Sequence, residues 1–187
     1  MRSIIAAFVL GFWPPAAVTA AEPATRAPDW FRSEIAQLSA EGGRWIADNA
    51  AYRSENEPFE AYGTEWISGF DGDTMRGRLF GVKDGNETAF DFWECRRYWH
   101  PGRKEGIVEQ FGWSGALGAG SITQDDGGTK SEQVFYNPDG SVTRTGHIAK
   151  FTDANTYVTE SFDIIGDEWR PRRTYVWKRQ PNADKSQ

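Results

Sequence analysis

From Gly43 onward, turn signals separate short runs that are rich in aromatic and β-branched side chains. The turn signals contain Asp-Gly, Gly-Asn and Pro-Asp-Gly clusters, which suit tight hairpins because glycine and asparagine tolerate a positive φ. Nine separators of this kind occur: SENEP (54–58), GFDGD (69–73), KDGNE (83–87), HPGRKEG (100–106), SGALGAG (114–120), QDDGGTK (124–130), NPDGS (137–141), FTDAN (151–155) and IGDE (165–168). The pattern predicts strands joined by short hairpins, which is an antiparallel meander. The glycine-rich separator 114–120 is interpreted as a wide turn or a bulge.

A meander of this length has two unpaired edges unless it closes on itself, and closure gives every backbone group a neighbour. We therefore predict an all-β fold, a single antiparallel up-and-down β-barrel of about 8 to 10 strands. A two-sheet sandwich is the alternative architecture. It is disfavoured because Greek-key crossings need longer connections than these separators provide.

One short amphipathic α-helix is predicted before the barrel, from Asp29 to Glu41. Asp29 is available as its N-cap, and Gly42 would end it. The apolar stripe of this helix consists of Trp30, Phe31, Ile35 and Leu38.

The first residues have the layout of a secretory signal peptide. Arg2 precedes an apolar run from Ile4 to Trp13, and small residues follow at Ala20 and Ala21. This run is shorter than the roughly 20 residues that a membrane span requires. We therefore predict export to the periplasm or the medium without stable membrane insertion. The predicted domain organisation is a signal peptide (1–21), a tether (22–28), one barrel domain (29–180) and a disordered tail (181–187).

Composition limits the partners and the sources of stability. The formal net charge of −6 disfavours nucleic acid as a partner, because binding phosphate needs a basic surface. Cys95 is the only cysteine, so no internal disulfide can form. The 9 Trp, 12 Phe and 6 Tyr must therefore supply stability through packing.

Three motifs in a fixed order resemble the lipocalins and the wider calycin barrels. Gly43, Arg44 and Trp45 form a G-x-W at the predicted first strand. A T-D-x-x-x-Y follows at 152–157, and two arginines, Arg172 and Arg173, lie on the approach to the predicted last strand. The chain looks most like the lipocalin-like families of exported bacterial proteins without an assigned activity.

The resemblance implies a barrel closed at one end by Trp45, with Arg173 or Arg172 lying across its indole ring. A guanidinium above an indole face would contribute roughly 0.5 to 2 kcal/mol. The chain departs from the lipocalin pattern before Gly43, and the predicted meander has one or two strands more than eight.

The predicted strand DFWECRRYWH carries charge and aromatic rings on both faces. Side chains alternate along a strand, so Trp93, Cys95 and Trp99 share one face while Glu94 and Arg96 share the other. We prefer the first face as the lining of the lumen, which leaves Glu94 and Arg96 as a solvated pair. The opposite orientation would bury that pair and mark a polar ligand site.

Binding of a small, largely apolar or aromatic molecule in the lumen is the preferred function. Polar groups such as Glu94, Arg96, Gln110 or His147 would orient the molecule among the tryptophans. The predicted ligand-binding residues are Trp66, Trp93, Trp99, Glu94, Arg96, Gln110, Trp113 and His147.

No catalytic residue, metal site or cofactor is predicted. The chain has no H-x-H, H-E-x-x-H or Cys/His cluster. Ser114 lacks the spacing of a G-x-S-x-G motif, and Cys95 is expected to be an inert buried thiol. Some related barrels hold haem through a histidine, which makes His100 and His147 the residues to consider for such a group.

Two other functions stay open. One is an enzyme, an isomerase, cyclase or hydrolase, that uses an inward glutamate with arginine or histidine support. The glutamates inside predicted strands are Glu65, Glu94, Glu109 and Glu160. The other is a packed barrel that acts as an interaction protein, with exposed aromatic residues forming a homodimer or binding another partner.

Overall fold

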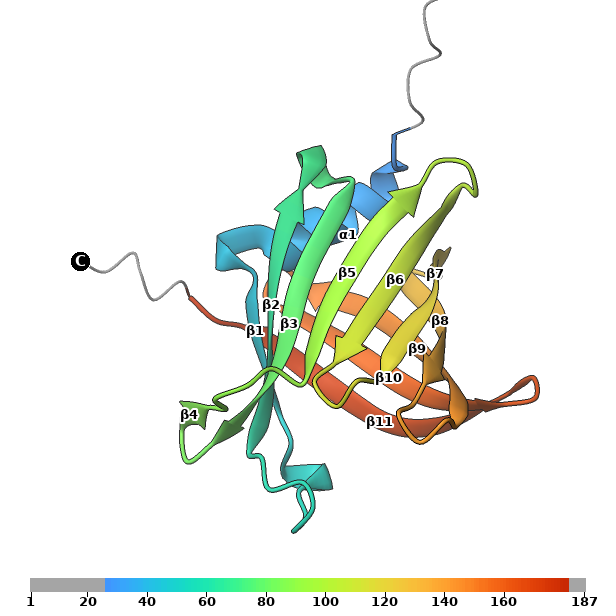
Figure 1. The fold of residues 1–187 in the computed structure, drawn as a ribbon. Helices are drawn as coiled ribbons and strands as arrows, with labels where there is room; N and C mark the ends of the chain where they lie inside the picture. The colour runs from blue at the N-terminus through green and yellow to red at the C-terminus, as the bar shows by residue number, and fades with distance from the viewer. Residues whose placement is uncertain (1–25, 182–187) are drawn as a thin grey trace, which may run out of the picture.

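The computed structural model describes residues 26–181, and the fold is one barrel with a helix at one end (Figure 1). The predicted signal peptide (1–21), the first part of the tether (22–25) and most of the predicted tail (182–187) lie outside the described residues. Helix α1 (Asp29–Ser39) leads through the 3-10 turn Ala40–Gly42 into eleven strands. The strands are β1 (Arg44–Asp48), β2 (Ala61–Gly69), β3 (Thr74–Lys83), β4 (Asn86–Glu87), β5 (Trp93–His100), β6 (Glu105–Gly112), β7 (Leu117–Asp125), β8 (Gly128–Tyr136), β9 (Val142–Asp153), β10 (Thr156–Ile165) and β11 (Glu168–Arg179).

Ten of the strands close into an antiparallel up-and-down barrel, which confirms the predicted fold class. Each barrel strand pairs with the next along the chain, and β1 pairs with both β2 and β11, so the ring has no free edge. The short strand β4 pairs only with the end of β3, in a hairpin that projects beside the barrel (Figure 1).

Helix α1 lies across one end of the barrel with its apolar face inward. Phe31, Ile35 and Leu38 are buried there, as their helical spacing predicts. The predicted N-cap is wrong: Pro28 precedes the helix, and Asp29 is its first residue. The carbonyl oxygen of Pro28 accepts hydrogen bonds from the backbone amides of Phe31 and Arg32, so the end of the predicted tether already belongs to the fold.

Trp45 closes the barrel beneath this helix, and its side chain is fully buried. The indole Nε1 donates a hydrogen bond to the carbonyl oxygen of Leu38 over 2.9 Å. The cation above the ring is Arg179, whose guanidinium carbon lies 4.1 Å from the ring centroid, so the predicted pairing with Arg173 or Arg172 is wrong. Arg179 reaches this position because it ends β11 beside β1, whereas Arg173 lies six residues earlier, toward the opposite end of the barrel.

The glycine-rich segment 114–120 is mostly strand rather than a wide turn, because β7 begins at Leu117. The backbone of Gly120 lies very close to the backbone of the neighbouring strand β8. A Cβ atom on Gly120 would lie 1.7 Å from the carbonyl oxygen of Glu132 in β8. The glycine therefore permits a close approach of β7 and β8.

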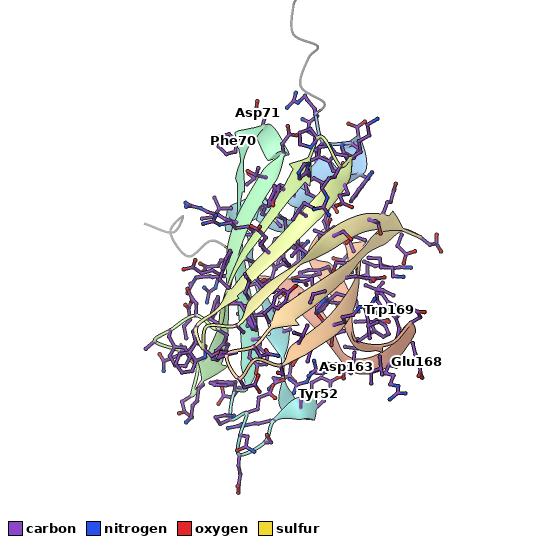
Figure 2. The ribbon with its side chains drawn as sticks, turned by 45° about the vertical axis from the view of Figure 1, so that its right-hand side comes forward. Tyr52, Phe70, Asp71, Asp163, Glu168 and Trp169 are labelled. Carbon is purple, nitrogen blue, oxygen red and sulfur yellow. The ribbon has the colours of Figure 1, made fainter. Side chains whose placement is uncertain are left out.

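Different connecting segments lie at the two ends of the barrel. The helix end carries the β2–β3 turn, where Phe70 and Asp71 lie, and the opposite end carries the long β1–β2 connection with Tyr52 (Figure 2). Within residues 26–181, no helix combines the length and the apolar character needed to cross a bilayer.

Candidate functional site: the barrel lumen

The lumen contains a cavity of about 870 Å³. This volume lies in the range of roughly 300 to 1,000 Å³ that is typical of small-molecule pockets. Helix α1 and every barrel strand except β1 contribute residues to its wall. Trp113, in the β6–β7 turn, lines the cavity and is 69% exposed, so the cavity reaches solvent at the end opposite the helix.

One wall of the cavity is aromatic and apolar. It is formed by the inward side chains of β2, β3 and β5 and by the segments before β2 and β5. We call it the aromatic wall, and it consists of Phe59, Tyr62, Trp66, Leu79, Phe92 and Trp93. Phe92 contacts Phe59 and Tyr62 edge to face, with ring centroids 4.9 Å and 5.9 Å away. Such contacts hold large rings in fixed orientations, which gives the wall a defined shape.

The facing wall is polar and is formed by β8, β9 and β10, which lie across the ring from β2, β3 and β5 (Figure 1). We call it the polar wall, and it consists of Thr129, Ser131, Gln133, His147 and Ser161. His147 is directly opposite Ser131 on β8 and Ser161 on β10 in the strand register. The three residues form one row across adjacent strands, and each side chain is able to donate or accept a hydrogen bond.

An ion pair lies at the helix end of the cavity. Glu34 on α1 accepts hydrogen bonds from Arg97 Nη1 and from Thr129 Oγ1, both over 3.0 Å. The Glu34 side chain is 10% exposed and that of Arg97 is 22% exposed. The Arg97 guanidinium carbon also lies 5.1 Å from the centre of the Trp66 ring. The carboxylate therefore binds the helix to β5 and β8 as well as neutralising a cation in the lumen.

A second ion pair lies at the open end. Both terminal nitrogens of Arg173 donate to the carboxylate of Glu57, over 2.5 Å and 2.6 Å. Tyr62 also donates to Glu57, over 2.6 Å, and Tyr175 donates to the buried Asn49 over 2.8 Å. These contacts attach the connection between β1 and β2 to β11 across the rim of the cavity.

The remaining ionisable groups that line the cavity are held in their neutral forms. Desolvation, followed by repulsion from Arg97 and Arg172, lowers the pKa of His147 to about 4. Burial raises the pKa of the Cys95 thiol, and burial also raises the pKa of Tyr157 to about 12. Burial and the hydrogen bond to Glu57 raise the pKa of Tyr62, and burial raises that of Tyr175.

Two glutamine side chains connect the polar wall to β5. Gln133 Nε2 donates to Gln110 Oε1 over 2.8 Å, and Gln110 Nε2 approaches the Cys95 sulfur at 3.5 Å. The lone cysteine is 5% exposed, so it is a packed and hydrogen-bonded thiol rather than an accessible one.

Five of the eight residues predicted to bind a ligand lie along the cavity: Trp66, Trp93, Gln110, Trp113 and His147. The preferred orientation of β5 is the observed one, since Trp93 and Cys95 face the lumen. Trp99 continues this face but packs against α1, with its ring centroid 6.2 Å from that of Trp30 and 5.8 Å from that of Phe31.

Glu94 and Arg96 lie on the outer surface of the barrel. The prediction that they bind a ligand in the lumen is therefore wrong. Both are exposed, and the Arg96 guanidinium carbon lies 5.6 Å from the ring centre of Phe111, which is also on the outer surface. The strand glutamates Glu65 and Glu109 also lie outside the cavity lining, where Glu65 pairs with Arg44 and Arg78 and Glu109 accepts a hydrogen bond from Tyr98.

Sequence analysis missed three of the four charged residues of the lumen, Glu34, Arg97 and Glu57, and gave Arg173 a different role. The sequence around Glu34 and Arg97 nevertheless contains a signal. Glu34 lies between Phe31 and Leu38 on the apolar stripe of the helix, where a carboxylate is out of place unless it has a partner. Arg97 shares the strand face of Trp93 and Cys95. Glu57 lies in a turn segment, and nothing in its local sequence marks it.

The two histidines lie in different parts of the barrel. His147 lines the lumen, whereas His100 ends β5 and accepts a hydrogen bond at Nδ1 from the backbone amide of Arg103. Within residues 26–181, no three His, Cys, Asp or Glu side chains gather as a metal site would require.

The sequence matches no protein-family model, and no curated protein matches it either.

Proposed function

We propose that the protein is a lipocalin-like barrel that binds a small, largely apolar or aromatic molecule in its lumen. The observation that carries the proposal is a cavity of about 870 Å³ in which an aromatic wall faces a polar one. Apolar pockets with a few placed polar groups are the usual form of small-molecule sites. Trp45 beneath Arg179 at the closed end also supports the lipocalin-like assignment.

Tryptophan emission during ligand titration tests this proposal. The panel contains fatty acids, retinoids, haem and aromatic metabolites. A ligand in the lumen is expected to quench emission at micromolar concentration and to raise the melting temperature, because it binds only the folded state. A flat emission and an unchanged melting temperature across the panel would contradict the proposal.

Three variants locate the binding site. Trp93→Phe removes an indole from the aromatic wall, so it should reduce the quenching amplitude. Trp169→Phe removes an indole that packs on Phe162 away from the cavity lining, so it should leave that amplitude unchanged. Ser131→Phe places a ring in the cavity and should weaken binding at least about tenfold. An unchanged quenching amplitude in Trp93→Phe together with an unchanged affinity in Ser131→Phe would place the ligand elsewhere.

We also propose export to the periplasm or the medium, on the basis of residues 1–21. The N-terminal sequence of the mature protein, measured by mass spectrometry after expression of the whole chain, tests this. Cleavage after Ala20 or Ala21 is the expected result. A chain that retains Met1 to Ala20 would contradict it.

A homodimer is a second candidate function, and one observation favours it. Four exposed apolar residues lie directly opposite one another on the outer face of adjacent strands β6 to β9. They form a continuous row, the outer apolar row, which consists of Phe111, Leu117, Tyr136 and Val142. A contiguous apolar surface of this kind on a rigid sheet is typical of interaction sites. Two copies related by a two-fold axis could cover it with the same row.

A further inference from the structure

The charges in the lumen cancel. Among the described residues that line the cavity, two carboxylates and two guanidinium groups form the ion pairs Glu34–Arg97 and Glu57–Arg173. The histidine, cysteine and tyrosine side chains of the lining are neutral at neutral pH, because desolvation shifts each of their pKa values away from ionisation. A ligand therefore meets no uncompensated charge.

A charged ligand would either disrupt one of these pairs or bring an uncompensated charge beside a pair that is already neutral. A carboxylate that bound Arg97 would either displace Glu34, whose side chain is only 10% exposed, or add a second negative charge beside it. An ammonium group that bound Glu34 would likewise either displace Arg97 or add a second positive charge beside it. Losing one partner of a desolvated pair is strongly unfavourable, because the remaining charge has neither water nor a counter-ion.

A neutral polar group meets no such obstacle. The row Ser131–His147–Ser161 supplies hydroxyl groups and a neutral imidazole, each of which can donate or accept a hydrogen bond. The row faces the aromatic wall across the cavity. An alcohol, carbonyl or amide head can therefore bind the row while the apolar body of the molecule lies against the rings.

We infer that the lumen selects an electrically neutral amphipathic molecule over the carboxylate or ammonium with the same carbon skeleton. This inference rests on the proposed ligand-binding function and assigns the chemical class of its ligand. The deciding feature is that each guanidinium in the lumen is already paired with a carboxylate of the protein.

Three probes with one chain length test the inference: dodecanol, dodecanoate and dodecylammonium, each at pH 7. Each competes with N-phenyl-1-naphthylamine, a neutral aromatic dye whose emission rises in apolar surroundings. Dodecanol is expected to displace the dye at a concentration at least about tenfold lower than either ion. Dodecanoate or dodecylammonium that competes as well as dodecanol would overturn the inference while leaving the binding function intact. A dye that does not bind, with no response to any probe, would instead overturn the binding function.

Variants of the inner ion pair test the cause of the selectivity. Glu34→Gln leaves Arg97 uncompensated, so preference is expected to move toward dodecanoate by about tenfold or more. Arg97→Met leaves Glu34 uncompensated and is expected to move preference toward dodecylammonium. The double variant Glu34→Gln/Arg97→Met removes both charges and should restore the preference for dodecanol.

Glu94→Gln is the matched control, because it makes the same change in net charge on the outer surface. Its order of probe affinities should equal that of the unmodified protein. Circular dichroism and the melting temperature establish that each variant is folded, and the double variant keeps the test valid if one single variant does not fold. Unchanged preference in folded Glu34→Gln, or the same shift in Glu94→Gln, would overturn the inference.

Discussion

His147 is an uncharged hydrogen-bonding residue of the polar wall at neutral pH. Its imidazole is largely removed from water, and Arg97 and Arg172 further disfavour a proton on it. These effects lower its pKa to about 4 from an ordinary value near 6.5. The residue type that most often titrates near neutrality therefore remains neutral here.

This lowered pKa predicts a pH dependence of stability. The unfolded chain binds a proton at His147 below about pH 6.5, whereas the folded protein binds it only below about pH 4. The free energy of unfolding should therefore fall as the pH falls from about 6.5 to 4, with a contribution of roughly 2 to 3 kcal/mol from this residue. Urea denaturation at a series of pH values measures it.

His147→Gln keeps a polar side chain without a titrating group, so it should flatten this part of the profile. The lowered pKa values of Glu57 and Glu65 also make stability fall with acid, but they act equally in both proteins. The difference between the two profiles therefore isolates the histidine. Parallel profiles between pH 6.5 and 4 would contradict the prediction.

Arg179 shows how a single side chain joins three elements. Its nitrogens donate to carbonyl oxygens of Gln37 and Ala40 at the end of the helical segment and of Ala154 in the β9–β10 turn, over 2.6 to 2.9 Å. The guanidinium also covers the ring of Trp45. The end of α1 therefore obtains its hydrogen bonds from the last strand, because helix termini leave carbonyl groups without partners.

Among the elements, the β1–β2 connection (49–60) is attached to β11 by side chains. Glu57 bonds to Arg173 through both of its oxygens, and Asn49 bonds to Tyr175 and to the carbonyl oxygen of Phe59. Glu57 and Phe59 also line the cavity. Opening of this connection would therefore widen the access to the lumen.

Removing the anchor should loosen this connection selectively. Arg173→Met eliminates the bidentate ion pair, so amide hydrogen exchange in residues 50–58 is expected to accelerate about tenfold or more. Exchange in β9 and β10 should change much less, since their backbone ladders remain. Arg172→Met is the control, because Arg172 pairs with Asp163 on the outer surface, where both side chains are about half exposed. Equal acceleration in both variants, or none in Arg173→Met, would contradict the anchor.

For the whole molecule, the closed ring leaves none of the ten barrel strands with an unpaired edge, so self-association of the barrel is expected to use its outer face. We predict that the protein self-associates through the outer apolar row. The apparent mass in sedimentation equilibrium is expected to rise with protein concentration toward that of a dimer. Leu117→Asp places a charge in the middle of the row and should keep the protein monomeric.

Ile67→Asp is a matched control for this test, because Ile67 is an exposed apolar residue on β2, away from β6 to β9. It should associate as the unmodified protein does. A mass that stays monomeric at all concentrations, or equal association of Leu117→Asp and the unmodified protein, would contradict the predicted interface.

The fold and part of the site follow from local sequence signals. Turn residues at regular spacing predict the meander, and alternation along β5 places Trp93 and Cys95 on one face with Glu94 and Arg96 on the other. Alternation alone does not show which face of a strand points inward when both faces carry charged and aromatic side chains. The position of Trp99 near the helix end of β5 also matters. Trp99 shares the inward face, but there it packs on α1 instead of lining the cavity.

The sequence by itself determined a closed antiparallel barrel with one apolar helical face, because turn chemistry and side-chain period are properties of short segments. Only the tertiary structure decided which charges meet in the lumen. Glu34 and Arg97 are 63 residues apart, and Glu57 and Arg173 are 116 apart. Such pairs depend on how the ring closes and where the helix docks, and both are set by packing across the whole chain.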